Sequence, residues 1–129
     1  MHTTEDPKHS DMHRITTLEQ AQALVHRFAL ENGWTDVPNL DKFDHLHEEL
    51  LEMSQHLRYK DLDERIRVIR ENHSIFEDGI GDLLFGICRL ANQLNVDITQ
   101  AFNKAQSEIL RKYQGQISES RSVRDPCVR

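Results

Sequence analysis

The sequence has no apolar run long enough to span a bilayer, no block of consecutive lysines and arginines, and no C-x-x-C pair. Without an apolar run, we expect neither a membrane span nor a signal peptide, and we predict a cytoplasmic protein. A formal net charge of -6 argues against nucleic-acid binding through phosphate neutralisation. The cysteines, Cys88 and Cys127, lie far apart and suggest neither a disulfide framework nor a zinc site. Cys88 lies in an apolar stretch and is predicted to be a core residue.

Alternating strand patterns bounded by hairpin turns are also missing. Instead, apolar residues recur every three or four positions, which is typical of amphipathic helices. We therefore predict an all-α fold, a bundle of four to five helices. The expected helices cover 17–32, 40–57, 74–94 and 97–115, with a short helix or helical extension over 60–72.

Local signals mark where three of these helices begin. Side chains that can cap a helix are followed three residues later by Gln or Glu at Thr17–Gln20, Ser74–Glu77 and Asp97–Gln100. The polar ends of the chain are predicted to be a disordered segment, 1–15, and a flexible tail, 116–129. A single helical domain, 16–115, lies between them, as expected for a chain of 129 residues.

Composition points to an assembly of helical subunits. The hydrophobic fraction is 37% and the charged fraction is 29%. This balance fits small helical domains, and also oligomers in which the subunits complete one another's core. Phe85 lies near Asp82 on the helical wheel, so the helix over 74–94 is apolar on more than one side, which is usual for a sandwiched helix. We predict a homodimer or a dimer of dimers.

Two clusters of carboxylates are the most informative feature. One helix carries Glu48, Glu49 and Glu52 within the string HEELLE, within about 100° of one another and away from the apolar stripe. The helix over 74–94 carries Asp78 and Asp82, four residues apart and therefore on one side. A solvated polar face is one interpretation of each cluster. The other is a site for a hard divalent cation, because such ions take oxygen ligands.

The spacing of these clusters resembles that of the MazG family of all-α nucleoside triphosphate pyrophosphohydrolases. That family carries E-E-x-x-E on one helix and E-x-x-D on the next, the latter usually inside a string such as E-L-G-D-L-L-F, which supplies its aspartate. Here EELLE occupies 48–52, GDLLF occupies 81–85, and AFNKAQSEILRKY over 101–113 resembles the family's last helix. The resemblance covers about 17–115. HEELLE is not H-E-x-x-H, so a zinc protease is excluded.

The resemblance implies an activity and a metal site. The activity is hydrolysis of an NTP or dNTP to the monophosphate and pyrophosphate with Mg²⁺, or with Mn²⁺ in its place. Three residues would be metal ligands, namely Glu49, Glu52 and Asp82. Glu48 would hold a further ion or act as the base for the attacking water. The catalytic candidates are Glu48 and Glu49. Metal ions bridging phosphate oxygens offset developing charge and lower the pKa of bound water.

Substrate contacts are implied for the last helix. Lys104 and Arg111 are candidates for neutralising phosphate charge, with a solvated stripe as the alternative, and Tyr113 is the terminal aromatic. Trp34, which follows the first helix, either closes the core or stacks on a nucleobase. The resemblance also implies a bundle in which helices from two subunits pack together.

Three positions depart from the family pattern: Gln106 stands where the family has an asparagine, Glu108 stands at a position that is commonly basic, and the third departure is at position 79. Gly79 stands where the family has the glutamate of E-x-x-D, and Asp78 is the neighbouring carboxylate that would replace it. Glycine in a helix interior costs about 1 kcal/mol relative to alanine. Gly81 is expected, since the family keeps a small residue there, where another helix or the ligand would pass close. Because Gly79 replaces a family ligand, an alternative is that the protein is a catalytically degenerate module that binds nucleotides or interacts through its helices. A further alternative is an activity like that of phosphoribosyl-ATP pyrophosphohydrolase or of dimeric dUTPase.

Overall fold

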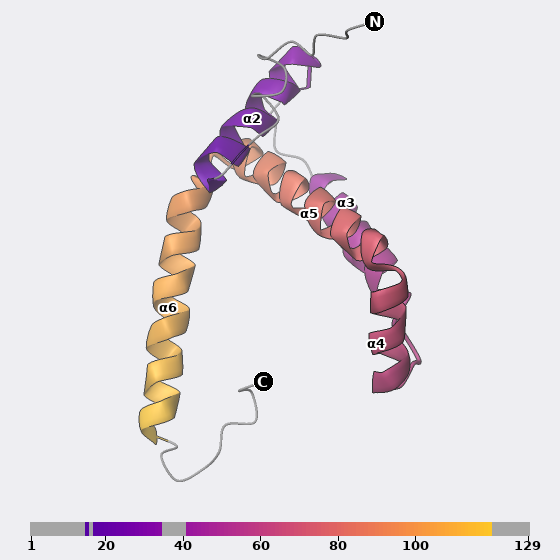
Figure 1. The fold of residues 1–129 in the computed structure, drawn as a ribbon. Coiled ribbons are helices and arrows are strands. Elements are labelled where there is room, and N and C mark those ends of the chain that lie inside the picture. Colours follow the sequence, from indigo (N-terminus) through magenta and orange to yellow (C-terminus); the bar gives the residue numbers. More distant parts are fainter. Residues whose placement is uncertain (1–14, 16, 35–40, 120–129) are drawn as a thin grey trace, which may run out of the picture.

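The computed structural model describes residue 15, residues 17–34 and residues 41–119. These residues form five helices and no strands (Figure 1), which confirms the predicted all-α fold. The helices are α2 (Leu18–Glu31), α3 (Asp41–Ser54), α4 (Leu62–Glu71), α5 (His73–Gln93) and α6 (Ile98–Glu119). Nearly all of the segment 1–15 and most of the tail 116–129, for which disorder and flexibility are predicted, lie outside the described residues.

Helices α3 and α5 pack closely through two glycines of α5. A Cβ added at Gly79 would overlap Met53 Sδ, and a Cβ added at Gly86 would lie 2.7 Å from Leu46 Cδ2. Because the earlier residue of α3 meets the later glycine of α5, the two helices run antiparallel. The glycines are seven residues apart and share one face of α5. This face lets the two helix backbones approach more closely than alanine would allow.

This packing reverses the expectation for the glycines of α5. The family pattern led us to expect the close approach at Gly81 and gave no reason for Gly79. In the structure Gly79 is buried against Met53, whereas nothing lies within 4 Å of a Cβ added at Gly81. The reason is the antiparallel pairing with α3, which selects the face of α5 that carries Gly79 and Gly86.

A small core forms where α2 crosses α5. It contains Ala21 and Val25 from α2, Cys88 and Ala91 from α5, and Ile98 at the start of α6. Cys88 is 1% exposed, which confirms its predicted place in the core. Burial raises the pKa of the Cys88 thiol, because the apolar surroundings disfavour the charged thiolate.

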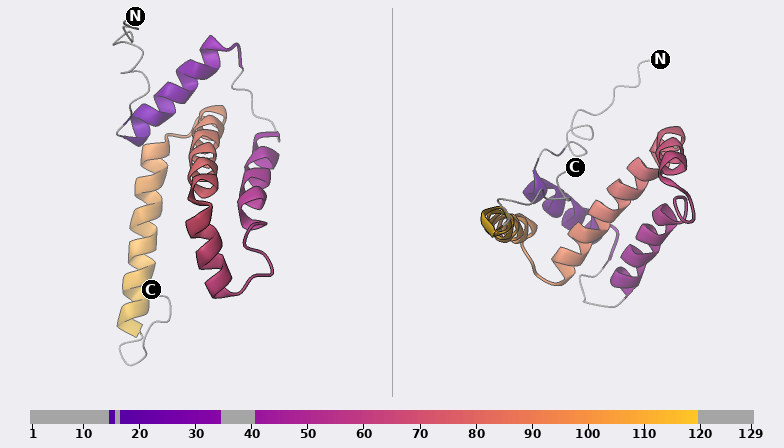
Figure 2. Two further views of the ribbon diagram at one scale, coloured as in Figure 1. Left: turned by 45° about the vertical axis from the view of Figure 1, so that its right-hand side comes forward. Right: turned by 90° about the horizontal axis from the view of Figure 1, so that it is seen from below.

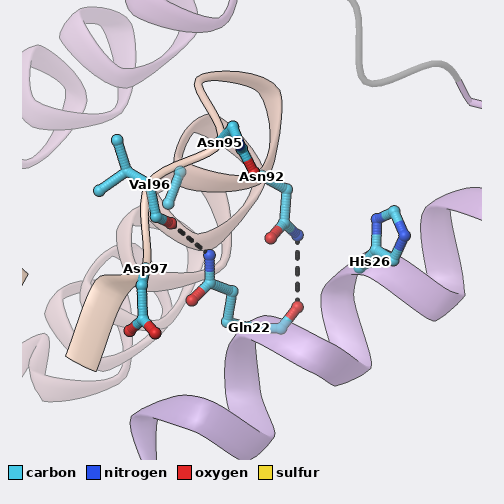
Figure 3. Close-up of a pocket in the computed structure, with 7 residues that line it drawn as sticks. Gln22, His26, Asn92, Asn95, Val96 and Asp97 are labelled. Atoms are coloured by element: carbon cyan, nitrogen blue, oxygen red, sulfur yellow. Dashed lines mark hydrogen bonds between the residues drawn. The ribbon is translucent and has the colours of Figure 1, made fainter. Parts of the chain in front are cut away.

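Gln22 of α2 holds the turn between α5 and α6 (Figure 3). Its Nε2 donates a hydrogen bond to the Val96 carbonyl at 2.6 Å, and its Oε1 accepts one from the Ile98 backbone N–H at 2.9 Å. Asn92 Nδ2 donates to the Gln22 carbonyl at 3.3 Å. Asn95 takes a left-handed φ of 53° in this turn, which Asn tolerates better than most residues. The start of α6 is thereby fixed against α2.

Beyond this turn α6 diverges from the rest of the molecule. It contacts α2 near its first residues, and α5 lies between it and α3 (Figures 1 and 2). The helix continues past Gly115, where the sequence predicts its end, to Glu119. Every described side chain from Ala101 to Gly115 is exposed. In a single chain, most of α6 therefore has no packing partner among the described residues.

Two of the three predicted helix starts are confirmed. Thr17 accepts a hydrogen bond from the Gln20 N–H at 3.1 Å, and Asp97 accepts one from the Gln100 N–H at 3.0 Å. The predicted capping box at Ser74 is wrong. Helix α5 begins at His73 after Asn72, which also ends α4, so Ser74 already lies inside the helix. No extended residue separates the two helices, and an N-cap needs such a residue.

Many apolar side chains of the described helices remain exposed. On α5 they include Ile80, Leu84 and Ile87, and on α6 they include Phe102, Ile109 and Leu110. The predicted apolar face of α5 is therefore only partly covered within one chain. None of the described helices is long and apolar enough to cross a membrane.

Candidate functional site

Four of the predicted metal ligands line one cavity between α3 and α5. Glu49 and Glu52 come from α3, and Asp78 and Asp82 come from α5. The cavity measures about 410 Å³, and we call it the acidic cavity. Its remaining lining residues are Met53, Gln55, His56, Ile75 and Gly79. The structure thus brings together acids that are about thirty residues apart in the chain.

The glycine contact positions these acids. Asp78 immediately precedes Gly79 and Asp82 follows it by three residues, while Glu52 immediately precedes Met53. The contact between Gly79 and Met53 therefore sits among the acids and sets the separation of the two helices at that level. A residue with a Cβ at position 79 would overlap the Met53 side chain, which would have to move within the lining of the acidic cavity.

The chemistry of the cavity suits a hard cation, but its geometry is not a finished coordination sphere. Carboxylate oxygens are the ligands that Mg²⁺ and Mn²⁺ take. Within the described part of the chain, however, no group of three or more His, Cys, Asp or Glu side chains is arranged to hold a metal ion. The four carboxylates share a cavity, and side-chain rotation would be needed for them to share an ion.

Glu49 is the most sheltered of these acids. Its side chain is 18% exposed, and its Oε1 lies 3.6 Å from His45 Nε2, one helical turn earlier. Glu52, Asp78 and Asp82 are exposed. Glu48 is also exposed, and it is not among the residues that line the cavity. Of the two predicted catalytic carboxylates, Glu49 is therefore the one that faces the acidic cavity.

The predicted phosphate-binding residues lie elsewhere in the single chain. Lys104, Arg111 and Tyr113 are on α6, and all three are exposed. Because α6 diverges from α3 and α5, the fold of one chain does not bring these three side chains to the acidic cavity (Figures 1 and 2).

Trp34 belongs to a second cavity and does not close the core. It is 43% exposed, with its ring edge-to-face with Phe28 at 5.4 Å between centroids. The guanidinium carbon of Arg89 lies 5.1 Å from the centre of the Trp34 ring. The cavity beside it, which we call the Trp34 pocket, measures about 370 Å³ and is lined by Trp34, Asp41, Lys42, His45, Arg89 and Gln93.

Of the six residues that line the Trp34 pocket, only Trp34 was predicted from the sequence as a site residue. Arg89 and Gln93 are each 7% exposed, although they are polar residues on an otherwise apolar part of α5. The sequence did contain a signal for this site: Arg89 is a charged residue within an apolar helical stretch, and a buried charge requires a partner. Lys42 had no comparable signal, since its neighbourhood forms only when α3 packs on α5.

Comparison of the chain with protein-family models, with curated proteins and with solved structures finds no match. The resemblance to the MazG family therefore depends on the sequence motifs alone.

Proposed function

We propose that the protein is a Mg²⁺-dependent nucleotide pyrophosphohydrolase that converts an NTP or dNTP to the monophosphate and pyrophosphate. The observation that carries this proposal is the acidic cavity, in which two antiparallel helices place four carboxylates. Clustered carboxylates without a counter-charge repel one another, and a divalent cation relieves that repulsion. Mn²⁺ would serve in place of Mg²⁺.

In the proposed site Glu49, Glu52 and Asp82 would hold the metal, and Asp78 would replace the family glutamate. A bound ion would neutralise phosphate charge and lower the pKa of a bound water. In the overall reaction the oxygen of water adds to the α-phosphorus, pyrophosphate leaves, and the water proton passes to a carboxylate. Glu49 suits that last role better than Glu48, because it lines the cavity, and as the base it would leave Glu52 and Asp82 to hold the metal.

Gly79 is compatible with this proposal because it has a packing role. A glutamate at that position would require Met53 to move away from α5. The carboxylate that the family keeps there is supplied instead by Asp78, which lines the same cavity. The loss of one family ligand thus accompanies a closer approach of the two helices that carry the others.

We further propose that the working form is a homodimer, or a pair of dimers. Exposed apolar side chains on α5 and α6, including Ile80 at 62% and Ile109 at 64%, favour a covered face. Because α6 diverges from its own acidic cavity, Lys104 and Arg111 would neutralise substrate phosphates at the cavity of the second copy. A partner helix packed on α5 would also account for the apolar residues beside Gly81.

Release of pyrophosphate from a panel of normal and modified nucleotides, with Mg²⁺ present, tests the activity. We expect Glu49→Gln and Asp82→Asn to abolish turnover while the helical circular dichroism spectrum is unchanged. Asp63→Asn is the matched control, because Asp63 is an exposed acid of α4 outside the lining of the acidic cavity. Wild-type turnover in both cavity variants would show that these residues are not the site.

A second function, a nucleotide-binding module without catalysis, is favoured by one observation. The described residues hold no ready-made group of three metal ligands. This alternative predicts that a nucleotide binds and raises the melting temperature, while no member of the panel is hydrolysed.

A further inference from the structure

His45 lies between the Trp34 pocket and the acidic cavity. It lines the Trp34 pocket, and it stands one turn of α3 before Glu49, which lines the acidic cavity. The Nε2 atom of His45 lies 3.6 Å from Glu49 Oε1. Residues four positions apart on a helix are neighbours on its surface, so the helix itself keeps the imidazole beside this acid.

Glu49 differs from the other acids of the cavity in its surroundings. Its side chain is 18% exposed, whereas Glu52, Asp78 and Asp82 are exposed. Among the described residues, Glu49 is also the one acid of this cavity whose carboxylate has an ion-pair partner. A sheltered carboxylate has fewer waters to bond, so a donor beside it has a larger effect than it would have on an exposed acid. Glu49 is therefore the acid whose orientation a neighbouring side chain controls best.

The imidazole of His45 can act as this donor. A histidine ring can carry a proton on Nε2 in its neutral form, and it carries one there in its charged form, so the bond is available in both. A distance of 3.6 Å exceeds that of a hydrogen bond, and a small rotation about the soft terminal torsions would close it. A donor on Oε1 leaves Oε2 for a cation. Carboxylates that bind metal ions are commonly oriented by such bonds from neighbouring side chains.

We propose that His45 is a positioning residue for Glu49 as a metal ligand. Its Nε2 donates a hydrogen bond to Oε1 and turns the carboxylate so that Oε2 faces the acidic cavity. His45 is not among the residues that line this cavity, so it acts through Glu49. The inference rests on the proposed metal site, and it assigns Glu49 to the metal rather than to the water proton.

Binding of Mn²⁺ to the full chain, followed by the electron paramagnetic resonance signal of the free ion, tests this role. His45→Leu removes the donor and is expected to weaken binding about tenfold. His45→Gln supplies another N–H group that can reach a residue four positions later, and it should recover most of the affinity. The matched control is His47→Leu, the same change at an exposed histidine of α3 outside the linings of both cavities, and it should bind normally.

Two further measurements separate positioning from a structural role. Without Mn²⁺, His45→Leu should melt close to His47→Leu, because the His45 side chain is 53% exposed and an exposed pair contributes little to stability. In a Glu49→Gln background, His45→Leu should weaken Mn²⁺ binding no further, because the two residues act as one unit.

The positioning role is overturned if Asp82→Asn weakens Mn²⁺ binding while His45→Leu binds as the wild type does, since the metal site would then stand without His45. It is also overturned if His45→Leu has its full effect in the Glu49→Gln background. A wild type that binds no Mn²⁺, or an Asp82→Asn variant that binds as the wild type does, would instead contradict the proposed metal site, and the role of His45 would fail with it.

Discussion

Lys42 shows how a single side chain can be placed at a cost to stability. Its ammonium group faces Arg89 from α5, with Asp41 and His45 on its own helix. Burial, and then the charge of Arg89, hold the pKa of Lys42 below its ordinary value of 10.5. A position that disfavours the charged form of a residue is more common at binding sites than in purely structural positions.

This placement gives the unfolding free energy a pH dependence that can be measured. Because the folded-state pKa of Lys42 is lowered, its stability penalty is fully present below that pKa and disappears as the pH rises towards 10.5. We expect Lys42→Met to melt higher than the wild type near neutral pH, and the difference to shrink as the pH approaches 10.5. Thermal melts of both proteins across this range measure the difference. A gap that widens with pH would mean that Lys42 is stabilised in the folded state.

The pairing of α3 with α5 depends on the absence of side chains at two positions. Gly79 and Gly86 meet Met53 and Leu46 across the contact, whereas Gly81 faces open space. The glycines of α5 therefore differ in role: Gly79 and Gly86 allow close packing against α3, and Gly81 does not. The helix propensity of glycine is unfavourable at all three positions, and only two of them gain close packing in return.

Alanine substitutions separate these roles. Gly81→Ala is expected to stabilise the isolated chain by about 0.5–1 kcal/mol, the difference in helix propensity. Gly79→Ala gains the same propensity but overpacks Met53 at a cost of about 1–3 kcal/mol, so that it should be less stable than Gly81→Ala by about that amount. Urea unfolding of both variants measures the difference.

A double-mutant cycle provides the control for this prediction. In a Met53→Ala background the overlap at position 79 is removed, and Gly79→Ala should then cost less than it does in the wild type. If Gly79→Ala stabilises the protein as much as Gly81→Ala does, the close contact with Met53 does not limit the packing of α3 on α5.

These elements also show what could be predicted from the sequence. The all-α fold, the caps at Thr17 and Asp97, and the burial of Cys88 follow from local patterns, and the structure confirms them. The boundary between the helices predicted over 60–72 and 74–94 lies within one residue of the observed one, but the capping box at Ser74 is wrong, because α4 and α5 meet at Asn72 without a linker. The role of Gly79 depends on which face of α5 meets α3, and no local pattern encodes that.

Local sequence patterns also do not predict which residues meet at the acidic cavity and at the Trp34 pocket. The sequence placed Glu49, Glu52, Asp78 and Asp82 on two helices, and the antiparallel pairing brings them to one cavity. The Trp34 pocket was missed apart from Trp34 itself, because its cations are 47 residues apart and meet only through packing.

At the scale of the whole molecule, the described chain is an open arrangement of helices. Its core contains few residues, and α6 extends away from α3 and α5 (Figures 1 and 2). Exposed apolar residues continue along α5 and α6. Helices with uncovered apolar faces are usually completed by a partner, and this supports the proposed homodimer.

Light scattering during size-exclusion chromatography tests that assembly. We expect a mass of twice 15.1 kDa, or four times for a dimer of dimers. Ile80→Lys and Ile109→Lys should shift the protein towards monomer, because each places a charge on an apolar face that is proposed to be buried. Gln114→Lys, an equal change in charge about 140° away from Ile109 on α6, is the control. A monomeric wild type at all concentrations would contradict the dimer.

Complementation tests whether two copies share a site. Asp82→Asn impairs the acidic cavity and Arg111→Gln impairs the proposed phosphate contact from α6. If each site combines the cavity of one copy with α6 of the other, co-expression should restore about a quarter of wild-type activity, since half of the random dimers would carry one intact site. No recovery, with each variant inactive alone, would place both residues in the same copy's site.

Binding of Mn²⁺, followed by loss of the electron paramagnetic resonance signal of the free ion, tests most directly whether the acidic cavity holds a divalent cation. Saturable binding to the wild type is predicted, weakened at least about tenfold by Glu52→Gln and by Asp82→Asn and unchanged in Asp63→Asn. Equal binding by all four proteins, or none by the wild type, would contradict a metal site at this cavity.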